Sequence, residues 1–229
     1  MSGPVLSIFS LVIRFAQKYC TLHRTGEANM NKPVLGVDAD DVIWDLCGQY
    51  VEHHNRRHGT NFTYEDVYTF DMIKMYGLPR EVILENIDRL LYEEHHKLVP
   101  FAGAVAAFTK LATVYDLQII TSRGISTRDI TIKALEGHAP GLFSDFHFTN
   151  GFSGDSHPKL TKRAVCQKIG AVALIEDAPM NIIEVANAGI PVYMHKRSWN
   201  TLVHHPELDH DLVIPFTYHH ELSKLLGIE

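Results

Sequence analysis

The chain has 229 residues, of which 45% are hydrophobic, so it can bury the core of one domain or of a domain with an insertion. Its charged fraction of 21% is ordinary, which excludes a largely disordered chain and a coiled coil. The formal net charge of −6 argues against binding of a nucleic-acid polymer, which needs a basic surface. One small phosphorylated ligand in a locally positive pocket is compatible with that charge.

The cysteines and histidines give no metal or disulfide signature. Cys20, Cys47 and Cys166 lie far apart and form no CxxC pair, so a reducing compartment such as the cytoplasm is favoured. Several of the fifteen histidines come as adjacent pairs. Adjacent residues on a helix do not share a face, so we interpret these pairs as partly exposed surface residues.

Residues 1–32 form an N-terminal appendage that differs from the rest of the chain. Its apolar run, Val5–Ile13, is too short to span a bilayer, and no membrane partner is expected. Residues 1–26 contain basic but no acidic side chains, as in an organellar presequence. The alternative is an upstream extension, with Met30 opening the domain, and the sequence does not choose between the two.

From Pro33 onward, short apolar strands alternate with helical stretches, which predicts an α/β fold with a Rossmann-like parallel sheet flanked by helices. The first strand ends at Asp38, the second at Thr121 and the fourth at Asp177. The predicted strands are 34–37, 117–120, 146–148, 172–175 and 190–194, and the predicted helices are 101–114, 127–135, 160–169 (closed by Gly170), 181–188 and 221–226.

A different pattern between the first and second strands predicts an inserted domain. Residues 46–98 contain no strand-like run, whereas Glu81–Tyr92 has helical periodicity. We interpret 46–98 as a small helical cap on a core made of 33–45 and 99–229. A cap inserted there would lie over the carboxyl edge of the sheet, where open α/β sheets bind ligands.

Reactive side chains follow three of the predicted strands and should converge at that edge. Asp38 with Asp40, Thr121 with Ser122, and Glu176 with Asp177 are all strand-tip residues. Asp38, Asp177 and the backbone carbonyl of Asp40 would supply the oxygen ligands that Mg²⁺ prefers. This set predicts attack by Asp38 on a phosphate ester, proton transfer by Asp40, and binding of phosphoryl oxygens by Thr121 and the Ser122 amide. A lysine is needed to neutralise the remaining charge.

Four segments carry a resemblance to a known superfamily. Val-Leu-Gly-Val-Asp-Ala-Asp-Asp-Val, Ile-Ile-Thr-Ser-Arg, Lys-Arg-Ala-Val-Cys-Gln-Lys-Ile-Gly and Ala-Leu-Ile-Glu-Asp-Ala-Pro resemble, in order, the motifs of haloacid dehalogenase (HAD)-like hydrolases. The resemblance covers the chain from about Pro33. Within the superfamily the chain is most similar to the 5'(3')-deoxyribonucleotidase-type branch, through residues 63–71 of the cap and residues 99–105 after it.

The resemblance implies a role for each matching residue. It places the nucleophile on Asp38, the acid/base on Asp40, the motif hydroxyl on Thr121 and the metal carboxylate on Asp177, with Glu176 behind it. It places the motif lysine on Lys162, with Lys159 as the alternative and Lys168 as a surface residue. Asp41 stands where the superfamily usually has glycine, which calls for a backbone conformation that Asp tolerates better than most residues.

The resemblance also implies the substrate class. The expected partner is a small phosphorylated metabolite, a nucleoside monophosphate in the nucleotidase branch, and a homodimer is left open. Arg123 is a candidate phosphate contact, equally compatible with a solvated arginine, and the candidate base contacts are Trp44, Tyr64, Tyr68 and Phe70. For each of these aromatics the alternative is packing in the core of the cap. The alternatives are a sugar-phosphate or other small-metabolite phosphatase and a catalytically weak phosphate-binding protein. Dehalogenase chemistry is disfavoured by Asp40, and a receiver domain by the order of the motifs.

Overall fold

The computed structural model describes residues 32–154, 156–202 and 205–228, and the appendage, with Cys20 and Met30, lies outside them apart from Lys32. Six parallel strands form one sheet in the order β3-β2-β1-β4-β5-β6, which confirms the predicted fold class. In the described residues, no helix combines the length and apolarity needed to cross a membrane. The strands are β1 (Val34–Val37), β2 (Asp116–Thr121), β3 (Asp145–Phe148), β4 (Ala173–Glu176), β5 (Val192–His195) and β6 (Val213–Phe216).

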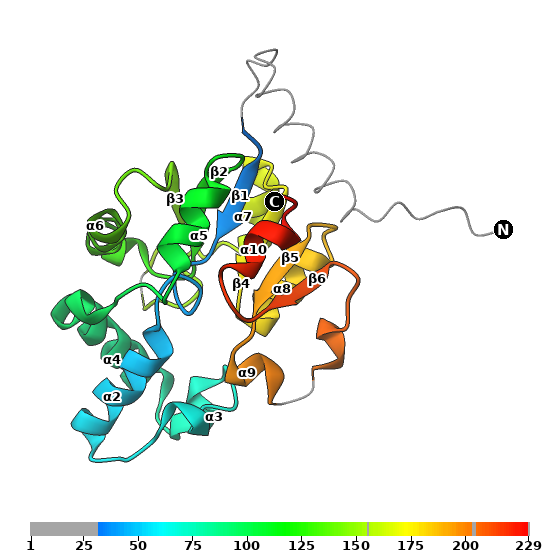
Figure 1. The fold of residues 1–229 in the computed structure, drawn as a ribbon. Coiled ribbons are helices and arrows are strands. Elements are labelled where there is room, and N and C mark those ends of the chain that lie inside the picture. The colour runs from blue at the N-terminus through cyan, green and yellow to red at the C-terminus, as the bar shows by residue number, and fades with distance from the viewer. Residues whose placement is uncertain (1–31, 155, 203–204, 229) are drawn as a thin grey trace, which may run out of the picture.

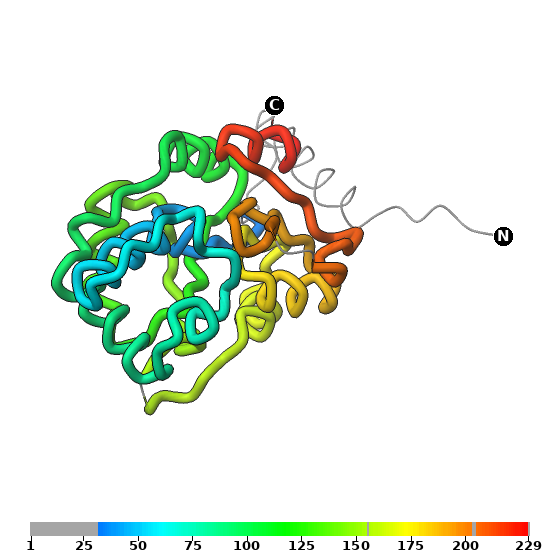
Figure 2. The backbone as a smooth tube through the Cα atoms, turned by 90° about the horizontal axis from the view of Figure 1, so that it is seen from below, coloured from blue at the N-terminus to red at the C-terminus, as the bar shows by residue number. Residues whose placement is uncertain are grey.

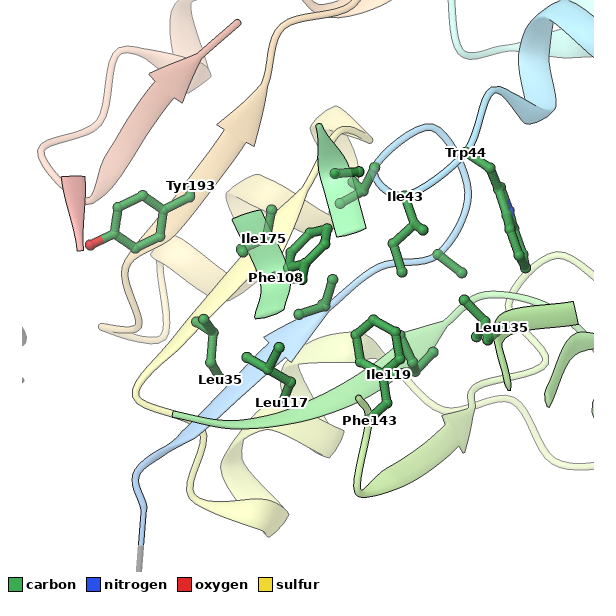
Figure 3. Close-up of a cluster of buried hydrophobic side chains, with 14 of the residues drawn as sticks. Leu35, Ile43, Trp44, Phe108, Leu117, Ile119, Leu135, Phe143, Ile175 and Tyr193 are labelled. Atoms are coloured by element: carbon green, nitrogen blue, oxygen red, sulfur yellow. The ribbon is translucent and has the colours of Figure 1, made fainter. Parts of the chain in front are cut away.

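Helices cover both faces of the sheet because its inner strands are apolar on both sides. Ile119 and Ile175 point to a core shared with α5 (Ala104–Leu111), α6 (Arg128–His138) and α10 (Glu221–Leu225) (Figure 3). Their neighbours Ile120 and Leu174 point to a second core with α7 (Lys162–Ile169) and α8 (Pro179–Ala186). Successive side chains thus alternate between two cores, as strand geometry requires.

Close packing around β1 explains its glycine. A Cβ atom at Gly36 would lie 2.7 Å from Cδ1 of Ile120 and 3.1 Å from Cδ1 of Leu174. Those side chains belong to the strands on either side of β1, and they would have to shift to admit a larger residue. Since β1 lies between β2 and β4, its tip, which carries Asp38, lies in the middle of the sheet.

All regular elements between β1 and α5 are helical, and they lie together beyond one end of the sheet (Figure 1). From below, these cap segments are the part of the chain nearest the viewer (Figure 2). The strands end towards them, so the cap stands over the strand tips. The cap elements are α2 (Leu46–His58), η1 (Tyr64–Asp66), α3 (Met72–Tyr76), α4 (Arg80–Glu93) and η2 (His95–Lys97).

Four further elements complete the core: η3 (Ile125–Thr127), α9 (Ser198–Thr201), η4 (Pro206–Leu208) and the edge strand β6. The sequence analysis did not predict β6, because Pro215 interrupts its apolar run. Proline removes a ladder hydrogen bond, but an edge strand tolerates this loss. Helix α7 ends at Gly170 with a φ of 66°, which confirms the predicted glycine cap.

Three of the paired histidines are not surface residues, which corrects the interpretation made from the sequence. His53, His54 and His219 are buried, while His204 lies outside the described residues. Nε2 of His219 donates to the carbonyl oxygen of Val42 at 2.7 Å. Adjacent residues on a helix point in different directions, but both directions can be covered by protein.

Candidate active site

Asp38 lies at the carboxyl tip of β1, where it is only 6% exposed. Its backbone N–H donates to the carbonyl of Ile175 at 3.0 Å, which extends the pairing of β1 with β4 by one residue. Its Oδ1 accepts the N–H of Ala39 at 2.8 Å, and its Oδ2 lies 2.7 Å from Nζ of Lys162. Burial, followed by repulsion from Glu176, raises the pKa of Asp38 well above its ordinary value, although Lys162 opposes the shift.

Lys162 is the lysine that reaches Asp38. It opens α7 directly after the N-cap Thr161, and its ammonium lies between Asp38 and Oε2 of Glu176, 2.6 Å from the latter. Burial lowers its pKa, but the two carboxylates outweigh burial and raise it overall. Lys159 and Lys168 are exposed, so the structure places Lys162 in the position expected for the motif lysine.

A buried group of three carboxylates forms the candidate metal centre. Oxygen atoms of Asp38, Glu176 and Asp177 all lie within 4.8 Å of one another. Oε1 of Glu176 accepts the N–H groups of Asp177 and Ala178 at 3.0 and 2.9 Å, and its Oε2 faces Lys162. Both oxygens of Glu176 are thus engaged by donors, which fits a carboxylate that orients its neighbours.

The donor set fits Mg²⁺. Burial raises the pKa of Asp177, and repulsion from Glu176, Asp41 and Asp38 raises it further, so a cation at this place would relieve the repulsion. Carboxylate and carbonyl oxygens are the ligands of hard cations. Asp38, Asp177 and the carbonyl of Asp40 would hold the ion. Nε1 of Trp199 donates to Oδ2 of Asp177 at 3.0 Å and fixes the orientation of that carboxylate.

Asp40 is held by a two-pronged contact from Arg123. Nε of Arg123 donates to Oδ2 of Asp40 at 2.8 Å, and its NH2 donates to Oδ1 at 2.6 Å. Burial raises the pKa of Asp40, but the charge and hydrogen bonds of Arg123 and the hydrogen bond from Trp44 lower it overall. Arg123 is only 5% exposed, so it is not a solvated arginine.

Trp44 has a different place from the one expected. It is fully buried and lies outside the pocket lining. Its Nε1 donates to Oδ1 of Asp40 at 2.8 Å, and the guanidinium of Arg123 lies 5.1 Å from its ring centre. Its large ring also fills the core beside Ile43 (Figure 3). Trp44 thus packs in the core, which was the alternative to base contact, and its indole N–H is used by Asp40.

The tip of β2 contributes Thr121 and Ser122. Thr121 is fully buried, and its hydroxyl accepts the backbone N–H of Arg123 at 3.2 Å. Ser122 lines the pocket in front of Asp38. The structure therefore brings together the strand-tip residues that the sequence analysis selected, from β1, β2, β4 and α7.

Asp41 adopts the left-handed conformation that a glycine would permit at this position. Its φ is 58°, a value that Asp reaches at modest cost. Its Oδ1 accepts the N–H of Cys47 at 3.0 Å, and Nδ1 of His195 lies 2.7 Å from its carbonyl oxygen. NH2 of Arg197 lies 4.0 Å from the same carboxylate. These contacts fix the loop after Asp38.

A pocket of about 120 Å³ lies between this cluster and the cap. Its floor is made of the charged strand-tip residues, and its cap side is mainly apolar. Of the cap aromatics considered from sequence, Phe70 lines it, whereas Tyr64 and Tyr68 do not. The cap residues in the lining are Leu46, Cys47, Tyr50, Val67, Thr69, Phe70, Met72, Tyr76, Ile87, Asp88 and Leu91.

The sequence analysis missed three residues that support the site. Trp199 and Arg197 lie on or next to α9, and His195 ends β5. Arg197 lies over the rings of Tyr64, Phe101 and Trp199, at 5.2, 4.6 and 5.7 Å, and so links the cap to the core. The signal that could have found them is the strand tip at His195, because polar residues also follow β1, β2 and β4.

Sequence comparison alone finds no relative: no protein-family model matches the chain, and no curated protein is significantly similar to it. Solved structures share its fold. A haloacid dehalogenase-like hydrolase from Streptococcus pneumoniae covers 84% of this chain and 97% of its own, with a TM-score of 0.60 and 14% identity. A predicted phosphoglycolate phosphatase from Haemophilus somnus covers 86% and 99%, with a TM-score of 0.56 and 14% identity.

A third similar structure, from Bacillus subtilis, is described as a HAD-hydrolase bound to magnesium. It covers 87% of this chain and 100% of its own, with a TM-score of 0.58 and 15% identity. At such low identity the likeness establishes the fold. The chain therefore has the fold of the HAD-like hydrolases, and these comparisons single out no nucleotidase branch within it.

Proposed function

We propose that this protein is a Mg²⁺-dependent phosphomonoesterase that acts through an aspartyl-phosphate on Asp38. The observation that carries the proposal is the surroundings of the Asp38 carboxylate. It lies in the floor of the pocket, with Nζ of Lys162 at 2.7 Å and the carboxylate of Asp177 beside it. A carboxylate nucleophile needs positive charge nearby in order to approach a phosphate dianion, and Lys162 supplies it here.

The side chains of the pocket floor can perform both halves of the reaction. Oδ of Asp38 bonds to phosphorus as the ester P–O bond breaks, and the leaving oxygen takes a proton from Asp40. Water then attacks the same phosphorus, Asp40 accepts a proton from it, and Asp38 leaves as a carboxylate with inorganic phosphate released. Thr121, the Ser122 amide and Lys162 stabilise the phosphoryl oxygens. Bound Mg²⁺ supplies charge neutralisation and in-line alignment.

For the substrate, we propose a nucleoside monophosphate. The mainly apolar cap side of the pocket suits the flat face of a base, with Phe70 as one contact. Among the described residues that line the pocket, Arg123 is the single cation, and its guanidinium is already paired with Asp40. An uncharged leaving group is therefore favoured over an acidic one.

A sugar-phosphate phosphatase is the second candidate. Its support is the shared fold of the structure described as a predicted phosphoglycolate phosphatase. Against it stands the mainly apolar lining of the cap side, where a free sugar would have to rely on a few polar side chains such as Thr69 and Asp88. A third reading, phosphate binding without turnover, depends on whether Asp41 impairs the site.

Hydrolysis of p-nitrophenyl phosphate with and without Mg²⁺ tests the reaction. We expect release that chelation abolishes and that Asp38→Asn lowers at least about 10³-fold, because the nucleophile is lost. Asp145→Asn, in the exposed start of β3, is the control and should keep full activity. Release that needs no metal, or that survives Asp38→Asn, overturns the proposal, and phosphate binding without release supports the third reading.

A screen of nucleoside monophosphates against sugar phosphates tests the substrate. We expect kcat/KM to be at least about tenfold higher for the best nucleotide, since burial of a base on apolar surface is worth more than 1.4 kcal/mol. Equal or better activity on sugar phosphates would rule out the nucleotide assignment while leaving the phosphatase chemistry in place.

A further inference from the structure

The contacts of Arg123 leave its guanidinium no freedom. Two of its nitrogens donate to Asp40, and its NH1 donates to the hydroxyl of Thr131 at 2.9 Å. Its backbone is held as well, by the hydroxyl of Thr121 and by the N–H of Asn150, which donates to the Arg123 carbonyl at 3.2 Å. A planar guanidinium with two parallel hydrogen bonds fixes both the position and the plane of its carboxylate.

The two oxygens of Asp40 have different surroundings. Oδ1 accepts two hydrogen bonds, from Nε1 of Trp44 and from NH2 of Arg123. Oδ2 accepts one, from Nε of Arg123. A carboxylate oxygen has about two lone pairs, so Oδ1 is filled and Oδ2 keeps one. Oδ2 is therefore the oxygen that can exchange a proton with a ligand.

Asp40 and Arg123 lie at the edge of the pocket, where Oδ2 of Asp40 can reach a bound ligand. Asp40 and Arg123 both line the pocket, and the Asp40 side chain retains 19% of its exposure while that of Arg123 retains 4%. The arginine thus lies behind the carboxylate and faces protein. Since Arg123 comes from β2 and Asp40 from the loop after β1, the contact also joins two strand tips.

We propose that Arg123 is a positioning residue that aims Oδ2 of Asp40 at the leaving-group oxygen, with Trp44 holding the opposite oxygen. The inference rests on the phosphatase function proposed above and adds a role for two residues that do not touch the reacting atoms. It predicts that replacing Arg123 lowers kcat/KM most for substrates whose leaving group must be protonated as it departs.

The dependence of kcat/KM on the leaving group tests this role in Arg123→Lys. This quantity covers the steps up to transfer of the phosphoryl group to Asp38, so hydrolysis of the intermediate does not enter it. For an alkyl phosphate we expect a loss of about 100-fold, because the leaving alkoxide needs a proton. For p-nitrophenyl phosphate, whose leaving group needs none, we expect a loss below about threefold. Lysine keeps the positive charge but cannot donate two parallel hydrogen bonds to one carboxylate.

Two comparisons keep the test specific. Arg128→Lys, which contacts Phe148 and the carbonyl of Phe146 but not Asp40, should match the wild type on both substrates. In an Asp40→Asn background, Arg123→Lys should cause no further selective loss for the alkyl phosphate. Equal losses on the two substrates, or effects that add in the double variant, would show a structural role only and overturn the proposal.

A measurement without turnover separates this proposal from the phosphatase function itself. In ¹⁵N-labelled wild-type protein, the Nε–H of Arg123 should exchange with solvent at least about 100-fold more slowly than that of the exposed Arg163. Asp40→Ala should remove that protection. An inactive wild type with the protection intact would reject the phosphatase proposal, and with it the leaving-group role, but would leave the fixed Arg123–Asp40 contact standing. Fast exchange at Arg123 in an active wild type would reject the positioning role and leave the phosphatase proposal standing.

Discussion

The two sides of the pocket differ in how tightly their side chains are determined. On the core side, Asp38, Lys162, Glu176 and Asp177 are almost fully buried, and each has named charged or hydrogen-bonding partners. On the cap side, the lining is mainly apolar, and Phe70 remains 43% exposed. Buried charges need specific partners, whereas apolar contacts are non-directional.

This difference indicates where chemistry and selectivity reside. Replacing one charge on the core side leaves another without its partner, so that side tolerates little change. The cap side requires only apolar surface of a suitable shape, so its residues can vary with the substrate.

Lys162→Met should be the most damaging change, since Asp38 and Glu176 would remain buried without their shared cation. We expect the free energy of unfolding to fall by about 3–5 kcal/mol in urea titrations without added metal. Lys168→Met, on the exposed side of the same helix, should change it by less than about 0.5 kcal/mol. A similarly small loss in both variants would contradict the view that the core side is the rigid one.

His195 links stability to pH beneath the core side. Burial, with help from His219 and Arg197, lowers its pKa to about 4, although its hydrogen bond to the Asp41 carbonyl opposes the shift. The unfolded chain, with an ordinary histidine pKa of about 6.5, then binds more protons, so stability falls as pH falls from about 6.5 to about 4. The contribution lost between pH 6.5 and pH 5 is about 2 kcal/mol.

Urea unfolding of His195→Asn at both pH values measures that contribution, because Asn keeps a donor near Asp41 but does not titrate. The variant should lose less stability than the wild type on acidification. His220→Asn, an exposed neighbour of buried His219, should keep the wild-type dependence. An identical pH dependence in the wild type and in His195→Asn would show that His195 does not contribute to the loss of stability on acidification.

Phe70→Ala tests the cap side. We expect KM for a nucleoside monophosphate to rise about tenfold, or about 1.4 kcal/mol, with kcat for p-nitrophenyl phosphate unchanged. Tyr68→Ala is the matched control, since Tyr68 is similarly exposed at 40% but lies outside the pocket. A fall in kcat on both substrates would place Phe70 in the chemical machinery and erase the difference between the two sides.

Asp41 should show the smallest effect. Asp41→Gly and Asp41→Ala both remove the hydrogen bond from Cys47, but only alanine pays the cost of a φ near 58°. We expect the glycine variant to be more stable than the alanine variant by about 1 kcal/mol in urea unfolding. Equal stabilities would mean that the loop relaxes out of the left-handed conformation.

Particular elements show how far the sequence could predict the fold. Strands β1, β2 and β4 were readable because apolar runs ended in reactive side chains. Helix α2 was not, since its sequence is mostly polar, although Asp45, whose side chain accepts the N–H of Gly48, and Gly59, with a φ of 65°, mark its two ends. Capping signals were thus present where hydrophobic periodicity failed.

The residues of the candidate site also divide into those that the sequence predicted and those that it did not. Parallel strands end at one edge, so Asp38, Thr121 and Asp177 could be brought together from the sequence, and the motif resemblance selected Lys162 for the remaining position. The sequence could not reveal that Arg123 and Trp44 hold Asp40 from behind. That contact joins residues 83 positions apart in the chain, and it depends on how β2 lies beside β1.

Local patterning was enough to predict five of the strands along the chain and the polar groups at their tips, because both follow from neighbouring residues. What the tertiary structure decided is which groups face the pocket and which face each other. Trp44, Phe70, Arg123 and Lys162 all looked like candidates for the site. Burial, the reach of each side chain and the requirement that buried charges be paired assigned one to the substrate side and three to holding the carboxylates.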